Sequence, residues 1–456
     1  MPSMNWQHLL TKDRLGVARS QEAAQWYRSA FQKDYDRLIF SAAFRRLQDK
    51  TQVFPLAQTD YVRTRLTHSL EVSSVARSIG TLVGQHLADN DRLGDLSASD
   101  VGTILSAAAL AHDIGNPPFG HAGEDGIGQF FADSEIGMRT LAEMTKAEQN
   151  DLLYFEGNAQ AFRLLTKLQN VDNDGGMQLS LATLASFIKY PCGSLERKTL
   201  DHIALKKFNY FQAEKDLFSS IMSRLEILPL LYNKSGEAIA WARHPLVYLL
   251  EAADDLCYSL VDIEDAYRLS LMSSGEVIGF YESIIAPYGG FPNKVKRITR
   301  DKDKIEYLRA FAMGLLIDEV VKAFIEHETE ILNGQLTVDL LSLIPSANVL
   351  ANIKTYAYDH IYVSQPVLEV GIAGHEIIEG LLKAFVGAVN QEYYARSTSK
   401  SRMLMSFLPD QFLGANRKLD ADPYLRILKI TDFISGMTDR YAVHVYQMIT
   451  GVHLTT

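Results

Sequence analysis

Apolar residues recur at helical spacing along most of this chain. Several segments place apolar residues at positions i, i+3, i+4 and i+7, the pattern of a helix that buries one face. In residues 66–83, for example, Leu, Val, Ile and Ala side chains form one wide apolar face. The segments predicted as helices on this basis are 23–48, 66–88, 100–112, 158–170, 215–229, 245–272, 305–333, 374–394 and 424–450. The pattern predicts an all-α protein.

Breaks between these segments mark loops. Clusters of Asp, Asn, Gly, Ser or Pro occupy residues 89–99, 171–177 and 287–304, and such clusters favour turns over helix. The last segment is the strongest candidate for a domain boundary, because Pro287 and Gly289 begin it and a run of basic residues follows at 294–304. Such a run is typical of a solvated loop, and a phosphate-contacting strip is the alternative.

Composition narrows the class of protein. The 456 residues allow up to about three domains. Lys and Arg number 45 against 55 for Asp and Glu, and the formal net charge of −10 argues against non-specific binding to nucleic acid or anionic membranes. No apolar stretch is long enough to span a bilayer, and the N-terminal residues lack the parts of a secretion signal. We expect a cytoplasmic protein with no membrane partner, in which Cys192 and Cys257 are buried free thiols.

The densest group of polar residues follows the apolar helix predicted at 100–112. His112 and Asp113 stand at its C-terminal end before a turn rich in Gly and Pro, where an imidazole and a carboxylate can reach one cation. After the turn, His121 and Glu124 are three residues apart, so a new helix would place them on one face. That arrangement suits a general base and a carboxylate that orients it. The group indicates a functional site rather than packing.

A stripe of polar side chains lies in the helix predicted at 245–272. Asp254, Tyr258 and Asp262 are spaced i, i+4 and i+8, so they share one face of an otherwise apolar helix. Burying such acids without a cation or a donor is costly. An exposed acidic stripe is the alternative, and it fits Asp255, Glu264 and Asp265. For Asp254 a functional role is favoured.

His68 lies near the start of the helix predicted at 66–88. Alone it would be a core histidine more often than a ligand. Arg63 and Arg65 precede it and suit bidentate contacts to phosphate, and Gln52 lies upstream in another polar cluster. The chain has no Walker-type P-loop, no GxSxG motif and no HExxH motif. Metal-assisted hydrolysis is the chemistry that remains.

The order His68, then His112 with Asp113, then a distant Asp254 resembles the H…HD…D metal signature of HD-domain phosphohydrolases. Further motifs are similar to those of the deoxyguanosine triphosphate triphosphohydrolase family, over nearly the whole chain. These motifs occupy residues 31–37, 44–55, 62–69, 112–124, 189–191 and 436–442. One departure is Phe433, which stands where related sequences have Tyr, so any hydroxyl contact made there is absent.

The resemblance implies an enzyme that hydrolyses a deoxynucleoside triphosphate, dGTP or several dNTPs, to the deoxynucleoside and inorganic triphosphate. It implies a divalent metal held by four side chains: His68, His112, Asp113 and Asp254. Such mixed ligands suit Mn²⁺, Fe²⁺, Ni²⁺ or Zn²⁺, while Mg²⁺ can act through the phosphates. The family pattern places His121 beside the α-phosphorus as acid and base, oriented by Glu124.

The same resemblance implies which side chains contact the substrate. Arg65 and Lys189 resemble triphosphate contacts, and Gln52 resembles a sugar contact. Tyr258 with Asp262 resembles the pair that contacts the 3′-hydroxyl and stacks against the deoxyribose. A close fit around C2′ would exclude ribonucleotides.

The expected organisation has three parts. Residues 1–60 are an N-terminal helical arm that contributes to the nucleotide site, 61–285 the HD phosphohydrolase core, and 286–456 a C-terminal helical region with oligomer and substrate-site contributions. The resemblance implies a homo-oligomer, such as a hexamer, and an activating nucleotide or single-stranded DNA in some members. Two alternatives stay open: an HD phosphohydrolase of other specificity, such as a 5′-nucleotidase, and a catalytically idle regulator that binds nucleotide or single-stranded DNA.

Overall fold

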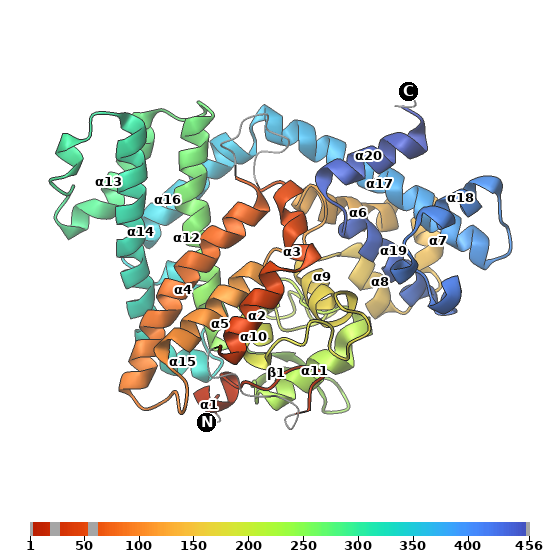
Figure 1. Cartoon of the computed structure of the whole chain (residues 1–456), viewed down its shortest axis with the longest axis horizontal. Helices are drawn as coiled ribbons and strands as arrows, with labels where there is room; N and C mark the ends of the chain where they lie inside the picture. Colours follow the sequence, from red (N-terminus) through yellow and green to blue (C-terminus); the bar gives the residue numbers. More distant parts are fainter. Residues whose placement is uncertain (1–2, 19–27, 53–62, 453–456) are drawn as a thin grey trace.

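The computed structural model describes residues 3–18, 28–52 and 63–452 and confirms the all-α prediction (Figure 1). Within these residues the strands β1 (Pro229–Tyr232) and β2 (Ala238–Trp241) form the only sheet, one antiparallel hairpin. None of the described helices is long and apolar enough to cross a membrane. Cys192 and Cys257 are buried and free, as predicted.

Three long helices form the centre of the molecule: α4 (Arg65–Asp89), α5 (Ala98–Ala111) and α12 (Pro245–Arg268). Helices α4 and α5 approach closely because glycines lie at their contact. A Cβ on Gly84 would lie 2.6 Å from the carbonyl oxygen of Ala98, a distance that only glycine avoids. Capping boxes at Thr64 and Ser97 fix where α4 and α5 begin. Because the three helices pack together, polar side chains from each can meet at one place.

A first hydrophobic core surrounds these three helices and runs from Met4 to Ile361. Its other helices are α1 (Trp6–Leu9), α2 (Ala30–Ile39), α3 (Ala42–Arg46), α9 (Gly157–Arg163), α10 (Leu181–Ser186), α11 (Lys215–Arg224), α13 (Ser274–Ile285), α14 (Asp301–Glu326), α15 (Glu328–Leu332) and α16 (Ala347–Ala357). Figure 1 shows α13, α14 and α16 at one end of the molecule, beside α12.

A second hydrophobic core fills the opposite end, where the C-terminal helices cover α6 (Figure 1). Its helices are α6 (His121–Asp133), α7 (Glu135–Leu141), α8 (Lys146–Leu153), α17 (Gln365–Tyr393), α18 (Ser399–Phe407), α19 (Pro423–Ser435) and α20 (Asp439–Thr450). The two cores do not divide at residue 286, since the first continues to Ile361. The three-part division of the chain stays a prediction.

Several predicted helices have other limits in the structure. Residues 424–450 form α19 and α20 rather than one helix, because the chain turns at Gly436 and Thr438 caps the next helix. The described part of 23–48 is also two helices, α2 and α3, with Ser41 capping the second; residues 23–27 lie outside the described residues. Segment 215–229 is helical only to Arg224, where the chain turns toward β1.

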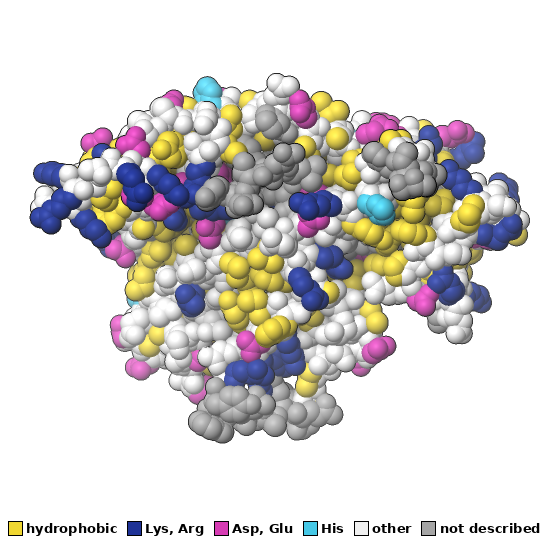
Figure 2. Space-filling model, turned by 45° about the horizontal axis from the view of Figure 1, so that its top comes forward, with side chains coloured by type: hydrophobic (Ala, Val, Ile, Leu, Met, Phe, Trp, Pro, Cys, Tyr) yellow, Lys and Arg dark blue, Asp and Glu magenta, His cyan; other side chains and the backbone are white. Residues whose placement is uncertain are grey.

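The basic run at 294–304 lies at the end of the molecule formed by α13 and α14. Figure 2 shows Lys and Arg side chains gathered there. Lys294, Lys296, Arg297 and Arg300 are exposed, while Val295 between them is buried. The segment is therefore solvated, as the charge run predicts.

Candidate active site

Three predicted metal ligands meet where α4, α5 and α12 pack together. His68 comes from α4, His112 caps the C-terminus of α5, and Asp254 lies in the middle of α12. Nε2 of His68 lies 3.1 Å from Oδ1 of Asp254, and Nε2 of His112 lies 3.4 Å from the same oxygen. All three side chains are buried, and one ligand atom from each lies within 4.8 Å of the others.

The orientation of His112 fits a metal ligand. Its Nδ1 lies 2.6 Å from the carbonyl oxygen of Ala109, so Nδ1 carries a proton, and Nε2 is the nitrogen that faces the carboxylates of Asp254 and Asp113. In the described part of the chain, Nε2 is buried and has no hydrogen-bond partner. A buried imidazole nitrogen that faces a carboxylate, with a second imidazole on the same carboxylate, is a donor set that suits a divalent transition metal.

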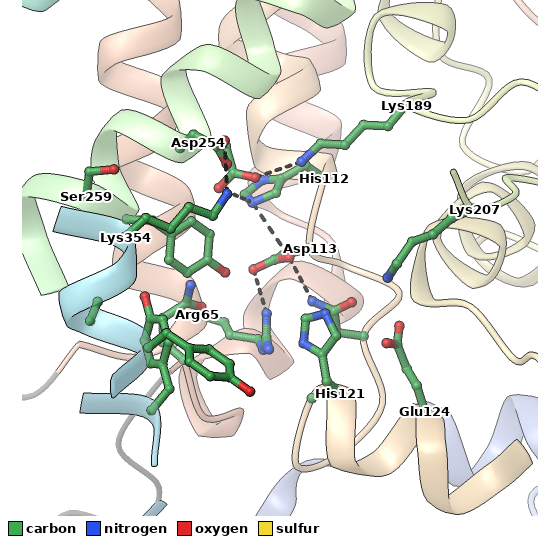
Figure 3. Close-up of a pocket in the computed structure, with 18 of the residues that line it drawn as sticks. Arg65, His112, Asp113, His121, Glu124, Lys189, Lys207, Asp254, Ser259 and Lys354 are labelled. Atoms are coloured by element: carbon green, nitrogen blue, oxygen red, sulfur yellow. Dashed lines mark hydrogen bonds and ion pairs between the residues drawn. The ribbon is translucent and has the colours of Figure 1, made fainter. Parts of the chain in front are cut away.

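Asp113 lies beside this cluster rather than within it. Its Oδ2 accepts a hydrogen bond from Arg65 at 2.7 Å, and its Oδ1 accepts one from the Asn116 amide at 2.7 Å. Oδ1 also lies 3.6 Å from Nε2 of His112, so a small rotation of the carboxylate would complete a four-ligand site (Figure 3). The role of Asp113 as a ligand stays a prediction.

Buried charges in this region are balanced against one another. Burial opposes ionisation of Asp254, but the Lys189 ammonium, 2.7 Å from its Oδ2, holds the pKa of that carboxyl well below its usual value. Burial likewise opposes ionisation of Asp113, and Arg65 holds its pKa low. Both carboxylates are therefore ionised at neutral pH, the form that binds a cation.

The turn after Asp113 delivers two further side chains. Phe119 and Gly120 both have positive φ, and a Cβ on Gly120 would lie 2.6 Å from the Arg65 guanidinium, so glycine is required there. Helix α6 then begins at His121, as predicted, and places His121 and Glu124 on one face (Figure 3).

The expected contact between His121 and Glu124 is not a hydrogen bond in the described residues. Instead, Oε1 of Glu124 accepts a 2.7 Å hydrogen bond from the backbone of Gly157. The pKa of His121 is lowered, first by the loss of water around its imidazole and then by the positive charges of Lys207 and Arg65. Burial raises the pKa of Glu124. A neutral imidazole is thus favoured at neutral pH.

A cavity of about 910 Å³ opens over these groups. Most of the predicted site residues line it: Gln52, Arg65, His112, Asp113, His121, Glu124, Lys189, Asp254 and Tyr258. Lys207, which the sequence did not single out, lines it as well. The opposite wall comes from α16 and α17 and is largely apolar, with Leu350, Ile353 and Val370. One end of the cavity therefore gathers three cations, Arg65, Lys189 and Lys207, among carboxylates, and the other end is mostly apolar apart from Lys354. Such a combination suits an amphiphilic anion such as a nucleotide when a metal ion offsets the carboxylates.

Two predicted residues, His68 and Asp262, are not among the cavity-lining residues. His68 packs its ring against Tyr258, with centroids 4.7 Å apart. Asp262 is buried and accepts a 2.6 Å hydrogen bond from the hydroxyl of Tyr362, which does line the cavity. Burial raises the pKa of Asp262 to about 7. Tyr362 was not predicted, and its segment offers no motif that would have revealed it.

Two family models match parts of this chain. An HD domain matches residues 65–170 and a phosphohydrolase-associated domain matches residues 345–448. Sequence similarity to individual relatives extends over almost the whole chain. A deoxyguanosinetriphosphate triphosphohydrolase-like protein of Synechocystis sp. is 42% identical over 99% of this chain and 100% of its own. One of Pseudomonas aeruginosa is 40% identical over 98% and 99%.

The chain belongs to the deoxyguanosinetriphosphate triphosphohydrolase-like family. A more distant relative, named deoxyguanosinetriphosphate triphosphohydrolase, comes from Salmonella typhimurium and is 28% identical over 98% of each chain. The HD match contains His68, His112, Asp113, His121 and Glu124. The second match contains Tyr362 and the apolar wall of the cavity.

The C-terminal family motif, residues 436–442, contacts through Asp439 two segments that line the cavity. Oδ2 of Asp439 accepts hydrogen bonds from the backbone and the hydroxyl of Thr51, at 2.9 and 2.6 Å, and its Oδ1 accepts one from the backbone of Phe119 at 3.0 Å. The buried Lys50 ammonium donates to the carbonyl oxygens of Asn116 and Ser435. These bonds tie α20 to the turn before His121 and to the segment that carries Gln52. The buried amide of Gln52 has no partner among the described residues, which leaves it free for a ligand.

Two other residues near the C-terminus, Arg440 and Phe433, contact protein side chains away from the cavity. Arg440 is exposed and pairs with Asp49 at 3.1 Å. Phe433, the departure from Tyr, packs its ring against Phe385, Phe407 and Phe412 in the second core. An aromatic ring without a hydroxyl is suited to that apolar position.

Proposed function

We propose that the protein is a metal-dependent hydrolase that cleaves a deoxynucleoside triphosphate to the deoxynucleoside and inorganic triphosphate. The observation that carries the proposal is the buried His68, His112 and Asp254 cluster beneath a cavity with cations at one end. Family membership supports it, since the Salmonella typhimurium relative is named for this reaction on dGTP.

Four side chains would hold the metal: His68, His112, Asp113 and Asp254. Their two imidazoles and two carboxylates favour Mn²⁺, Fe²⁺, Ni²⁺ or Zn²⁺ over an all-protein Mg²⁺ site. A divalent ion bound there supplies Lewis acidity toward a phosphoryl oxygen and lowers the pKa of water.

Three cations would bind the triphosphate. Arg65 and Lys189 line the cavity and pair with Asp113 and Asp254. Lys207 lies on the other side, where it pairs with Glu156 at 3.1 Å. Anionic phosphate oxygens between these groups would replace solvent with fixed positive charge, which stabilises the charge that develops on the phosphoryl group in the transition state.

His121 would transfer the proton. Its neutral imidazole can accept a proton from the attacking water, whose oxygen forms the new bond to the α-phosphorus. The bond from that phosphorus to the 5′-oxygen breaks, and the proton passes to the leaving 5′-oxygen. Glu124 lies three residues along the same helix, so its carboxylate can stabilise the imidazolium that forms in between.

The nucleoside would occupy the apolar side of the cavity. Gln52 offers an unpaired amide to the sugar, and the Tyr258 ring forms part of the wall. Asp262 does not line the cavity, but it accepts a hydrogen bond from the hydroxyl of Tyr362, which does. The two side chains would contact the 3′-hydroxyl as a pair. The base would lie against Leu350, Ile353 and Val370.

The test is a product assay. Purified protein is incubated with each of the four dNTPs and Mn²⁺ or Mg²⁺, and the products are resolved by anion exchange. We expect deoxynucleoside and triphosphate, lost in Asp113→Ala. Release of inorganic phosphate from a nucleoside monophosphate would indicate a 5′-nucleotidase instead. Nucleotide or single-stranded DNA binding with no turnover under any metal would indicate a regulator. Homo-oligomer formation and an activating ligand stay predictions.

A further inference from the structure

A second cavity adjoins the first on the side of α6. It measures about 390 Å³ and shares four lining residues with the first cavity: His121, Glu124, Glu156 and Lys207. Figure 3 shows Lys207 and Glu124 on the side of His121 that faces away from Lys354. The second cavity therefore begins where the phosphates would lie, and the apolar wall for the nucleoside is on the opposite side.

The outer part of the second cavity is rich in cations. Lys198 and Lys206 are exposed, and Arg197 stacks on the ring of Tyr154, with its guanidinium carbon 3.4 Å from the ring centroid. None of these three cations has an ion-pair partner among the described residues. The acidic residues that line the cavity are Glu124, Asp125 and Glu156, and Glu156 is already paired with Lys207.

We propose that inorganic triphosphate leaves the active site through this second cavity, where Arg197, Lys198 and Lys206 bind it in passing. The proposal rests on the proposed function, since it concerns the product of that reaction. Triphosphate carries several negative charges, and cations along its path lower the barrier for its departure. The deoxynucleoside is uncharged and lies on the apolar side, so the two products would leave in different directions.

Lys207 would pass the anion between the two cavities. It lines both cavities and is half-buried, and its ammonium forms an ion pair with the Glu156 carboxylate. Burial, and then the charge of Glu124, raise the pKa of Glu156 to about 7. The Lys207 side chain is long and flexible, so it can follow an anion from one cavity to the other while its charge remains.

The first experiment separates chemistry from product release. Lys198→Glu with Lys206→Glu reverses two exposed charges outside the active-site cavity. We expect the single-turnover rate of dNTP cleavage to remain that of the wild type, and the steady-state rate to fall about tenfold, because triphosphate release becomes slow. Lys296→Glu with Arg297→Glu is the matched control: it makes the same change in charge on exposed residues of the 294–304 segment and should change neither rate.

The second variant blocks the path without changing its charge. Ala132 is exposed on α6 and lines the second cavity, so Ala132→Trp fills space there without a buried clash. It should show the same pattern, with single turnover retained and steady-state turnover reduced.

Wild-type rates in both the charge-reversal and the Ala132→Trp variants would overturn the inference and leave the proposed function intact. A reduced single-turnover rate would also overturn it, because the cavity would then act before or during cleavage. If the wild-type protein releases no triphosphate from any dNTP, the proposed function and this inference fall together, and the product assay reveals that case before any variant is made.

Discussion

His112 shows how a helix end prepares a side chain for a metal. It caps the C-terminus of α5, where the last carbonyl groups have no partner within the helix. The Ala109 carbonyl therefore accepts from Nδ1 of His112, and Nε2 is left facing Asp254. The backbone thus fixes the orientation of the ring and leaves Nε2 toward the other cluster residues.

His121 is the residue whose replacement tests the division between metal binding and proton transfer. His121→Ala should lower turnover by about 100-fold or more, because acid and base catalysis at the α-phosphorus is lost. Metal content should stay that of the wild type, since His121 is not part of the buried ligand cluster. Triphosphate release and elemental analysis of the purified variant measure the two effects separately.

His68→Ala is the matched control, because it removes a cluster residue and should lower metal content as well as turnover. Loss of metal in His121→Ala would contradict the assignment and place His121 among the ligands.

At the scale of residues, local motifs marked most of the side chains that the structure brings together around the cavity, and tertiary contacts added others. One short segment, 112–124, contains four of the predicted site residues: His112, Asp113, His121 and Glu124. Its Gly and Pro residues do not favour a regular helix, so the sequence alone indicates a special turn that carries polar side chains. Lys207 and Tyr362 follow no such pattern. Tyr362 reaches Asp262 only because a π-helical turn at Tyr358–Tyr362 packs near α12, and no periodicity predicts that placement.

At the scale of elements, α12 depends on an unusual N-cap. Nδ1 of His244 accepts from the backbone of Leu246, and its Nε2 lies 3.2 Å from the carbonyl oxygen of Leu9. Burial lowers the pKa of this imidazole to about 4. The helix that carries Asp254 thus begins at a histidine that is neutral when the protein is folded.

This N-cap predicts a pH dependence of stability. The pKa of His244 is about 6.5 in the unfolded chain and about 4 in the folded protein. As the pH falls below 6.5, the unfolded chain therefore binds a proton that the folded protein does not, and the free energy of unfolding falls. Between pH 7 and pH 5 the loss is about 2 kcal/mol. His244→Asn retains a capping oxygen and should remove this part of the pH dependence. Urea unfolding of both proteins at the two pH values measures it.

His444→Asn, at an exposed position of α20, is the control and should keep the wild-type pH dependence. If His244→Asn loses as much stability as the wild type between pH 7 and pH 5, His244 is not the titrating group.

Element limits were predicted where periodicity was strong and missed where local chemistry decided. The long helices α4, α5 and α12 lie within a few residues of their predicted limits, because each has a continuous apolar face and a clear cap. The break between α19 and α20 was missed because the apolar pattern continues across Gly436. Shorter helices such as α7, with 7 residues, and α16, with 11, span too few turns to establish a period.

At the scale of the whole molecule, a buried charge network joins the HD part to the C-terminal helices. The Arg163 guanidinium, from α9, donates to both oxygens of Asp432 on α19, at 2.8 to 3.0 Å, and to Glu214. Gln160 adds a 3.0 Å hydrogen bond to Asp432. All four side chains are buried, so this network links the two hydrophobic cores with little contact with solvent.

Removing Arg163 should therefore destabilise the whole molecule. Arg163→Ala leaves two buried carboxylates with no cation, and we expect the free energy of unfolding to fall by about 3–5 kcal/mol. The deficit should be smaller at pH 5 than at pH 8, because burial already raises the pKa of Glu214 and protonation would relieve the uncompensated charge. Urea denaturation at both pH values, followed by circular dichroism, measures both effects.

Arg139→Ala is the matched control, since it breaks an ion pair with Glu135 in which both side chains are at least 74% exposed. Solvent screens such a pair, so its loss should cost less than about 1 kcal/mol. A deficit in Arg163→Ala no larger than in Arg139→Ala would mean that apolar contacts alone hold the cores together.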